Sequence, residues 1–249
     1  WAEAGLFSSS PIGLTPDSAR TWFAEYGIDF INRMVEGYDV TAIGNVCPQP
    51  AEIWMHSNVE VNSAADMEGL RMRAAGHGGH ILERMGVAVV FMPGGEVYEA
   101  MQRGVLDAFE YSSPAVDWPM GFQEVADYQY MSASRSPTDP LAFYLKKSKF
   151  EALPADLQAI ITQGVIAGTD RHHQWLEYES ALALQKFIDA GADVRKLPAD
   201  IDAAVLQASD EYYAEQAATE RPLYTEILDS IYEFKASWAE YRALTAFDA

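Results

Sequence analysis

Apolar residues along the chain follow two different periods, which predict both helices and strands. Residues 16–35 place apolar side chains at helical spacing, at Trp22, Tyr26, Phe30 and Met34. Residues 38–46 and 141–147 are instead short apolar and aromatic segments that favour β-strands, the first ending at a Cys-Pro-Gln-Pro turn. The sequence therefore predicts a mixed α/β fold.

The stretch from Leu70 to Tyr111 alternates short strands and helices. Strands are predicted at 70–74, 87–92 and 105–109, and helices at 76–85 and 96–103. A β-α-β-α-β order with short connections requires a parallel sheet. Open sheets of this kind bind ligands beyond the carboxyl ends of their strands.

The second half of the chain is mainly helical. A helical pattern begins after Pro154 and continues to Gly191, and it either kinks near Gly164 and Gly168 or runs across two lobes. The last predicted helix, 221–244, carries an apolar stripe at Leu223, Ile227, Ile231, Phe234, Trp238 and Tyr241. That stripe must pack either on this chain's own core or on a second subunit.

Charge and composition exclude some classes of partner. The chain has 37 acidic and 17 basic residues, a formal charge of −20, which argues against nucleic acid or an anionic membrane surface as a partner. The single cysteine, Cys47, cannot form an internal disulfide, and we interpret it as a small buried residue. No stretch approaches the roughly 18 apolar residues of a membrane span.

Polar residues follow two of the predicted strands where an apolar core would not need them. Arg73 ends the first strand, and Glu110 follows the third. Arg73 fits a ligand carboxylate, because a guanidinium offers a planar fork of donors, or it is a surface arginine like Arg71. Glu110 is either a solvated residue or a ligand of a hard cation, and Glu52 is a second carboxylate that could converge on it.

Other motifs give little support to catalysis. His77 and His80 in Gly-His-Gly-Gly-His do not match a zinc spacing and have no third ligand nearby, and His172-His173 is a weaker candidate still. The glycines of this segment are not followed by the Gly-Lys-Ser/Thr of a phosphate loop, and no Gly-x-Ser-x-Gly elbow is present.

Taken together, these motifs resemble the substrate-binding proteins of the tripartite ATP-independent periplasmic (TRAP) transporters. The resemblance rests on the segments 69–73 (Gly-Leu-Arg-Met-Arg), 76–79, 93–101 and 104–110, and on the long helix with its Leu-Pro-Ala-Asp-Leu start. It implies an α/β, two-lobe periplasmic-binding-protein fold, with a long kinked helix that spans both lobes. It also implies that the N-terminal part of lobe one is missing from this chain.

The resemblance further implies how the chain divides into parts. Lobe one would include 1–40 and 110–135, lobe two would include 41–109 and 136–152, the inter-lobe helix would be 153–192, and a C-terminal helical region would be 193–249.

The resemblance also assigns roles to residues of the site. Arg73 falls where the family pairs an arginine with the ligand carboxylate. Glu110 and Tyr111 fall where the branch that binds 2-oxo acids and lactate holds a metal ion through a Glu side chain and the next carbonyl. Glu52 matches a further metal ligand of that branch, a Gln. The implied cofactor is Na⁺ or Ca²⁺ bridging the ligand, held by Glu52, Glu110 and Tyr111.

One position departs from that branch and leaves two models open. The branch has another acidic metal ligand where this chain has Ser136, and Arg135 stands beside it. Either a metal ion still binds, or the guanidinium of Arg135 replaces it and helps to bind the substrate. The sequence slightly favours the metal, because Glu110 and Tyr111 keep the branch's arrangement.

The function implied is that of a periplasmic solute-binding protein without catalytic activity. It would capture a small organic acid, a 2-oxo or 2-hydroxy monocarboxylate, and deliver it to the TRAP membrane permease subunits, with a homodimer formed through the C-terminal helix. The alternative is an α/β enzyme that acts on a carboxylate substrate with Glu110 or Glu52 as base. A third class, the ligand domain of a membrane-bound sensor, would need a membrane segment that the sequence does not show.

Overall fold

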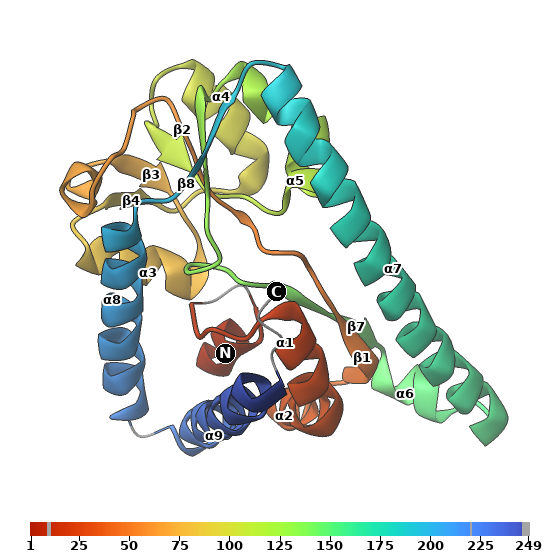
Figure 1. The fold of residues 1–249 in the computed structure, drawn as a ribbon. Helices are drawn as coiled ribbons and strands as arrows, with labels where there is room; N and C mark the ends of the chain where they lie inside the picture. The colour runs from red at the N-terminus through yellow and green to blue at the C-terminus, as the bar shows by residue number, and fades with distance from the viewer. Residues whose placement is uncertain (9–10, 220, 246–249) are drawn as a thin grey trace.

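The computed structural model describes residues 1–8, 11–219 and 221–245. It contains two α/β parts, one above the other in Figure 1, joined by two crossing segments and by long helices along their edges. The mixed α/β fold predicted from the sequence is confirmed.

The upper part is built on a six-stranded sheet in the order β4-β3-β5-β2-β6-β8. Its strands are β2 (Ile53–Ser57), β3 (Arg71–Arg73), β4 (Ala88–Val90), β5 (Ala108–Phe109), β6 (Tyr128–Met131) and β8 (Asp193–Lys196). Strand β3 pairs in parallel with β4 and with β5, so the predicted parallel arrangement is confirmed. Strand β2 is antiparallel to both of its neighbours. The full sheet is therefore mixed.

Short helices connect these strands and cover the sheet. They are α3 (Gly76–Arg84), α4 (Val97–Gln102) and α5 (Pro114–Asp117), together with 3₁₀ turns at Ala64–Met67, Gly94–Glu96, Trp118–Met120 and Phe122–Glu124. The first of these turns is closed by a reciprocal capping box between Ser63 and Asp66. Apolar residues of β2, β3, β5 and β6 form the core beneath the helices.

The lower part is built from the N-terminal region and the last helix. Helices α1 (Pro16–Trp22) and α2 (Ile28–Met34) are joined by a π-helical turn, Phe23–Gly27, and a 3₁₀ turn covers Ala2–Phe7. They pack with a two-stranded antiparallel sheet of β1 (Thr41–Pro48) and β7 (Pro140–Leu145), which is followed by α6 (Lys147–Glu151). Trp22 is fully buried at the centre of this second core.

Two extended segments cross between the two parts, and these two crossings are hydrogen-bonded to each other. One crossing leads from β1 to β2, and the other leads from β6 to β7. The Gln49 N–H donates to the Asp139 carbonyl at 3.1 Å, the Thr138 hydroxyl to the Gln49 carbonyl at 2.7 Å, and the Glu52 N–H to the Ser136 carbonyl at 3.2 Å. These bonds fix the backbones of Glu52 and of the segment that carries Arg135 side by side.

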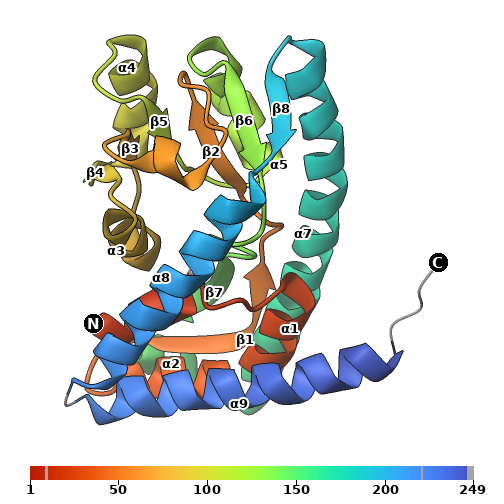
Figure 2. The same cartoon turned by 60° about the vertical axis from the view of Figure 1, so that its left-hand side comes forward.

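Three long helices frame the molecule. Helix α7 (Ala155–Asp189) contacts β1 near one end and α5 near the other, so it spans both parts, as predicted (Figure 1). It continues through Gly164 and Gly168 without interruption. Helix α8 (Ala199–Ala217) leads back to α9 (Pro222–Thr245), which crosses beneath α1 and α2 and extends beyond them at its C-terminal end (Figure 2).

The two cores suggest lobe boundaries that differ from those predicted. Strand β6 lies within 110–135 and pairs with β2, so this segment shares its sheet with 53–109. We therefore propose that one lobe comprises 53–131 with β8 and the start of α8. The other lobe would comprise 1–48, β7, the end of α8 and α9, in line with the residues of each core.

We expect two glycine substitutions to have opposite effects on stability. Gly44 in β1 has a φ of +73°, and a Cβ there would lie 2.7 Å from Val165 Cγ1 of α7. Gly44→Ala should therefore lower the free energy of unfolding by at least ~1 kcal/mol. Gly164 is an exposed helical glycine with open space around it, so Gly164→Ala should raise that free energy by about 0.5–1 kcal/mol. Urea unfolding checks both, and a stable Gly44→Ala would contradict the close packing of α7 on β1.

Candidate functional site

The ends of two neighbouring parallel strands bring Arg73 and Glu110 together. Arg73 is the last residue of β3, and Glu110 directly follows β5, where Phe109 pairs with Arg73. The Arg73 Nη1 donates to Glu110 Oε1 and to the Glu110 carbonyl, both at 2.8 Å, and its Nε donates to the Met92 carbonyl at 3.2 Å. The two residues singled out from the sequence therefore form one ion pair at the carboxyl edge of the sheet.

The crossing segments add a second acid and a second base to this pair. The Arg135 Nη2 donates to Glu52 Oε2 at 2.7 Å, and its Nη1 donates to Glu110 Oε2 at 3.4 Å. Arg73, Glu110, Arg135 and Glu52 thus form a continuous chain of alternating charges, which we call the charge cluster. The structure brings together all four charged residues that the sequence analysis proposed.

The charge cluster is almost entirely removed from solvent. Glu52, Glu110 and Arg135 are 3%, 6% and 4% exposed. Burial would lower the pKa of Arg135, but the Glu52 and Glu110 carboxylates outweigh burial and raise it. Burial, with a smaller contribution from Glu52, raises the pKa of the Glu110 carboxyl, while Arg135 and Arg73 oppose that shift. Each buried charge therefore depends on its neighbours in the cluster.

Backbone groups hold Arg135 in place. Its Nε donates to the Trp54 carbonyl at 3.1 Å, and its Nη2 also donates to the Ile53 carbonyl at 3.3 Å. A Cβ at Gly78 would lie 3.7 Å from the Arg135 Cγ, so the first turn of α3 packs directly on this side chain. The Ala75 N–H, just before α3, bonds to the Glu110 carboxylate. The positive amino end of α3 therefore lies next to the charge cluster.

Arg73 is the member of the cluster that is left with an available donor. Its side chain is 11% exposed, the largest exposed fraction in the cluster. In the residues that the structure describes, its Nη2 has no hydrogen-bond partner, whereas its Nε and Nη1 are both engaged. The Nη2 group of the guanidinium can therefore bind an anion from outside while Nε and Nη1 stay fixed to the protein.

Tyr111 extends the site with an aromatic wall. Its ring packs edge-on against Phe122 at 5.0 Å between centroids. The Gly94 backbone approaches the same ring so closely that a Cβ there would lie 2.8 Å from it. Tyr111 is partly exposed, so it can cover a small ligand beside Arg73.

The donor set around the cluster does not suit a metal ion. Among the described residues, no group of three or more His, Cys, Asp or Glu side chains could hold one. The two carboxylates expected to bind a cation, Glu52 and Glu110, both accept hydrogen bonds from Arg135. The sequence left a choice between a metal ion and Arg135, and the structure places the guanidinium between these carboxylates. The role predicted for the Tyr111 carbonyl stays a prediction.

A buried histidine–aspartate pair lies behind the site, and the sequence analysis missed it. His56 on β2 and Asp117 at the end of α5 are both fully buried, with His56 Nε2 at 2.9 Å from Asp117 Oδ2. The imidazole stacks on Phe109 at 4.6 Å, and burial raises the pKa of Asp117, opposed by His56. Asp117 also accepts the Ser112 N–H at 3.3 Å, which fixes the turn after Glu110. His56 and Asp117 are 61 positions apart, and no sequence motif links residues at that separation.

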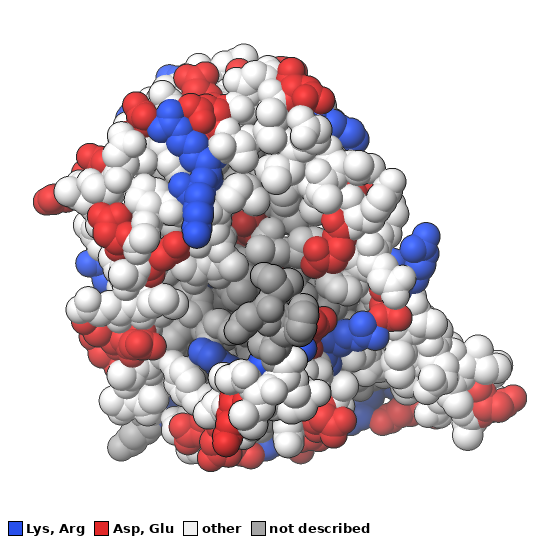
Figure 3. Space-filling view, viewed as in Figure 1, with Lys and Arg blue, Asp and Glu red and all other residues white. Residues whose placement is uncertain are grey.

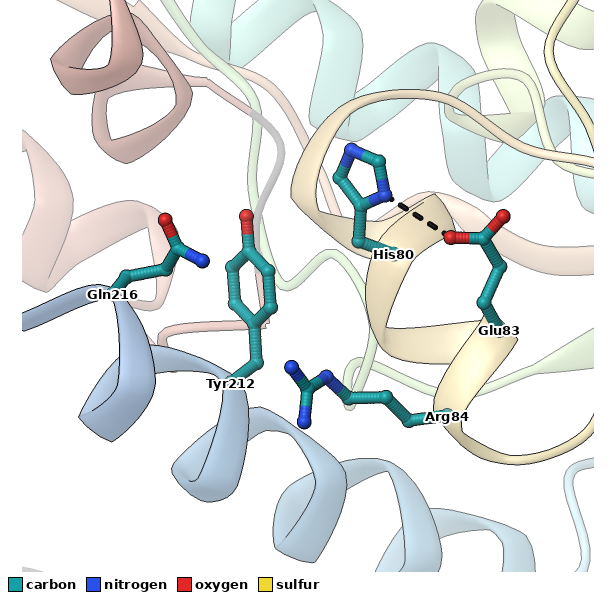
Figure 4. Close-up of a pocket in the computed structure, with 5 residues that line it drawn as sticks. All are labelled: His80, Glu83, Arg84, Tyr212 and Gln216. Carbon is teal, nitrogen blue, oxygen red and sulfur yellow. Dashed lines mark hydrogen bonds and ion pairs between the residues drawn. The ribbon is translucent and has the colours of Figure 1, made fainter. Parts of the chain in front are cut away.

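One surface cavity has none of the charge cluster among its lining residues. It has a volume of about 490 Å³ and is lined by His80, Glu83, Arg84, Tyr212 and Gln216 (Figure 4). His80 Nδ1 lies 3.1 Å from Glu83 Oε2, and Arg84 pairs with Glu215 on α8. His80, Glu83 and Arg84 are exposed side chains of α3, and Tyr212 and Gln216 lie on α8, so this cavity is a groove between two helices rather than a buried site.

The remaining candidates from the sequence have structural roles. His77 packs among tyrosine rings of α8 and α9, where burial lowers its pKa to about 4. The His173 ring lies 2.8 Å from the Pro48 carbonyl. Cys47 is buried, as interpreted from the sequence, and burial raises the pKa of its thiol to about 11. Arg71 is an exposed arginine paired with Asp107.

Acidic side chains are spread over the whole face seen in Figure 3, with basic side chains between them. Within the described ranges, no helix combines the length and the apolar character that a bilayer crossing requires.

Comparison with known proteins gives a consistent result. The family described as bacterial extracellular solute-binding protein, family 7, matches residues 49–220. A monocarboxylate 2-oxoacid-binding periplasmic protein of Nostoc sp. is 26% identical over 214 residues, which cover 85% of this chain and 58% of that protein. The chain thus spans little more than half the length of this relative.

Two solved structures share the fold over nearly the whole chain. A TRAP periplasmic solute-binding protein of Colwellia psychrerythraea with bound calcium and pyruvate is 28% identical, with a TM-score of 0.87 over 96% of this chain and 73% of that one. A TRAP solute-binding protein of Bordetella bronchiseptica, a mixed-occupancy dimer with copurified calcium and picolinate, is 25% identical. It has a TM-score of 0.84 over 97% of this chain and 72% of that one.

We expect the His56–Asp117 pair to stabilise the sheet behind the site. Asp117→Ala leaves a fully buried imidazole without its partner and should lower the free energy of unfolding by about 2 kcal/mol or more. The double variant His56→Phe/Asp117→Ala should lose less than the sum of the two single variants, because neither buried polar group is then left alone. Glu99→Ala, which breaks an exposed pair with Arg103, is the control. Additive losses in urea unfolding would show that the pair is not coupled.

Proposed function

Because this chain belongs to family 7 of the bacterial extracellular solute-binding proteins, we propose that it captures a small organic acid for a TRAP transporter. The single observation that carries the proposal is the available Nη2 group of Arg73 at the carboxyl end of β3. A carboxylate bound there would accept from a guanidinium whose Nε and Nη1 are already fixed by Met92 and Glu110. Open sheets bind their ligands at this edge.

The balance of charges favours a ligand with one carboxylate. The charge cluster contains two glutamates and two arginines, so its formal charges sum to zero before a ligand arrives. A single carboxylate can be matched by the free donors of Arg73 and by the amino end of α3. A second carboxylate on the ligand would be desolvated beside Glu110 without a cation of its own. A 2-oxo or 2-hydroxy monocarboxylate is the class we propose, as in the relative that binds 2-oxoacids.

The paired carboxylates argue against the alternative of an enzyme. Glu110 and Glu52 were the proposed bases, and both are buried and accept hydrogen bonds from guanidinium groups, so neither is open to a substrate proton. Proteins of this family act as receptors, so a panel of 2-oxo and 2-hydroxy acids incubated with the protein should be returned unchanged. Turnover of any member, followed by NMR, would favour the enzyme.

We further propose that the protein acts in the periplasm and passes its ligand to the TRAP membrane permease subunits. Family membership supports this partner and this compartment. Binding between the two lobes would bring both of them to one orientation that a permease can recognise.

Arg73→Ala should weaken the binding of pyruvate by about 30-fold or more, because loss of a desolvated charge partner typically costs 2–5 kcal/mol. Arg73→Lys should recover only part of this affinity, since an ammonium cannot present two parallel donors. Isothermal titration calorimetry measures both. Arg71→Ala on the same strand, an exposed arginine paired with Asp107, is the matched control and should bind as the wild type does. Unchanged binding by Arg73→Ala would remove the basis of the proposed site.

The last helix supports a homodimer only through its second half. Tyr224, Ile227 and Ile231 of α9 are fully buried in this chain's own core. Farther along the helix, Tyr241 and Leu244 are 57% and 82% exposed. We propose that this exposed end packs on a second copy, because one relative forms a dimer and the helix extends past the body of the protein (Figure 2).

A double variant tests the dimer without disturbing the core. Tyr241→Ser/Leu244→Ser should shift the protein from dimer to monomer in sedimentation velocity, because two exposed apolar side chains lose their partner surface. Glu233→Ser/Glu240→Ser on exposed positions of the same helix is the control. A truncation at Pro222 is unsuitable, since it would remove the buried residues of α9. A monomeric wild-type protein would rule out the dimer.

A further inference from the structure

We propose that Arg135 is the built-in cation of the ligand site, so that this protein binds its carboxylate ligand without a metal ion. The inference rests on the proposed function and states how the site neutralises its own acidic groups. It sets this chain apart from the relatives that hold calcium together with pyruvate or picolinate.

The guanidinium lies where a bridging cation would have to be. It is within hydrogen-bond distance of Glu52 Oε2 on one side, at 2.7 Å, and of Glu110 Oε2 on the other, at 3.4 Å. Calcium takes six to eight oxygen ligands, and among the described residues no group of three or more His, Cys, Asp or Glu side chains could hold an ion. An ion placed between Glu52 and Glu110 would meet the N–H groups of Arg135, which repel a cation.

Arg135 cannot move aside at low cost. Its side chain is 4% exposed and donates to the carbonyls of Trp54 and Ile53 as well as to the two carboxylates. Withdrawal would leave two buried carbonyls and two buried carboxylates without these donors. Both neighbouring backbones are fixed in turn, because the two crossings are hydrogen-bonded to each other through Glu52 and Ser136.

The arginine also supplies the charge that the site needs. It carries one positive charge, as a sodium ion would, and with Arg73 it balances Glu52 and Glu110. The glutamates therefore do not repel an incoming carboxylate as a bare acidic pair would. The negative charge of the bound ligand would lie next to Arg73 and to the amino end of α3. Gly78 of this helix packs on Arg135.

Metal removal gives a direct test on the wild-type protein. Pyruvate is titrated calorimetrically into the full chain in choline chloride with EDTA, and separately in sodium chloride with calcium. We expect the two affinities to agree within about threefold. A larger loss of affinity in the sodium-free, chelated buffer would overturn the inference, because it would show that an ion is required.

A variant gives the complementary result. Arg135→Ala should lose about tenfold or more in pyruvate affinity in the chelated buffer, because Glu52 and Glu110 are then unneutralised beside the ligand. Arg71→Ala is again the matched control, and thermal melting checks that both variants fold. Wild-type affinity in a folded Arg135→Ala would overturn the inference. If Arg135→Ala does not fold, the comparison of the two buffers on the wild-type protein decides whether ligand binding requires a metal ion.

A third measurement separates this inference from the proposed function. Calcium alone should leave the melting temperature of the wild-type protein unchanged, whereas a rise that Glu52→Gln abolishes would show a metal site and overturn the inference. If neither pyruvate nor any other acid of the panel binds in any buffer, the proposed ligand class is wrong. The effect of calcium on melting still decides the role of Arg135.

Discussion

A buried charged side chain needs a group of opposite charge in contact with it, and this constraint determines the architecture of the site. Glu52 and Glu110 are removed from water by the sheet and by the crossing segments, and an unpaired carboxylate in such a place is strongly destabilising. The protein meets the constraint with two arginines that come from different elements, the end of β3 and the segment after β6. The sheet order, the two mutually bonded crossings and the close packing of α3 at Gly78 all hold these four side chains together.

The two arginines differ in which of their donors are already used inside the protein. Arg135 has its donors turned toward carboxylates and backbone carbonyls inside the protein, so in the proposed site it would act on the ligand through the charge balance. Arg73 is anchored through Nε and Nη1 and has Nη2 available. A site built in this way is organised before the ligand arrives, so binding need not order its charged groups.

The sequence predicted the local pattern well and the long-range pairing poorly. The β-α-β-α-β run, the long helix and the strand-end positions of Arg73 and Glu110 follow from periodicity and from the rule that ligands bind at carboxyl edges. Strand β2 was missed because it is short and buried along its whole length, so it shows no alternation. The His56–Asp117 pair and the link from Arg135 to Glu52 join residues far apart in the chain, and only the fold brings them together. The first half of α9 packs in the protein's own core. An apolar stripe alone does not show whether its partner surface lies in the same chain or in a second subunit.

The lower core is assembled from both ends of the chain, and this has a consequence for how the protein folds. The Trp22 indole donates to the Ser230 hydroxyl at 3.1 Å, and Arg33 pairs with Glu226. The sheet of the upper part draws five of its six strands from the continuous segment 53–131. Contacts between residues close in sequence form faster than contacts that close long loops. The upper part can therefore begin to fold during synthesis, whereas the lower part must wait for the last helix.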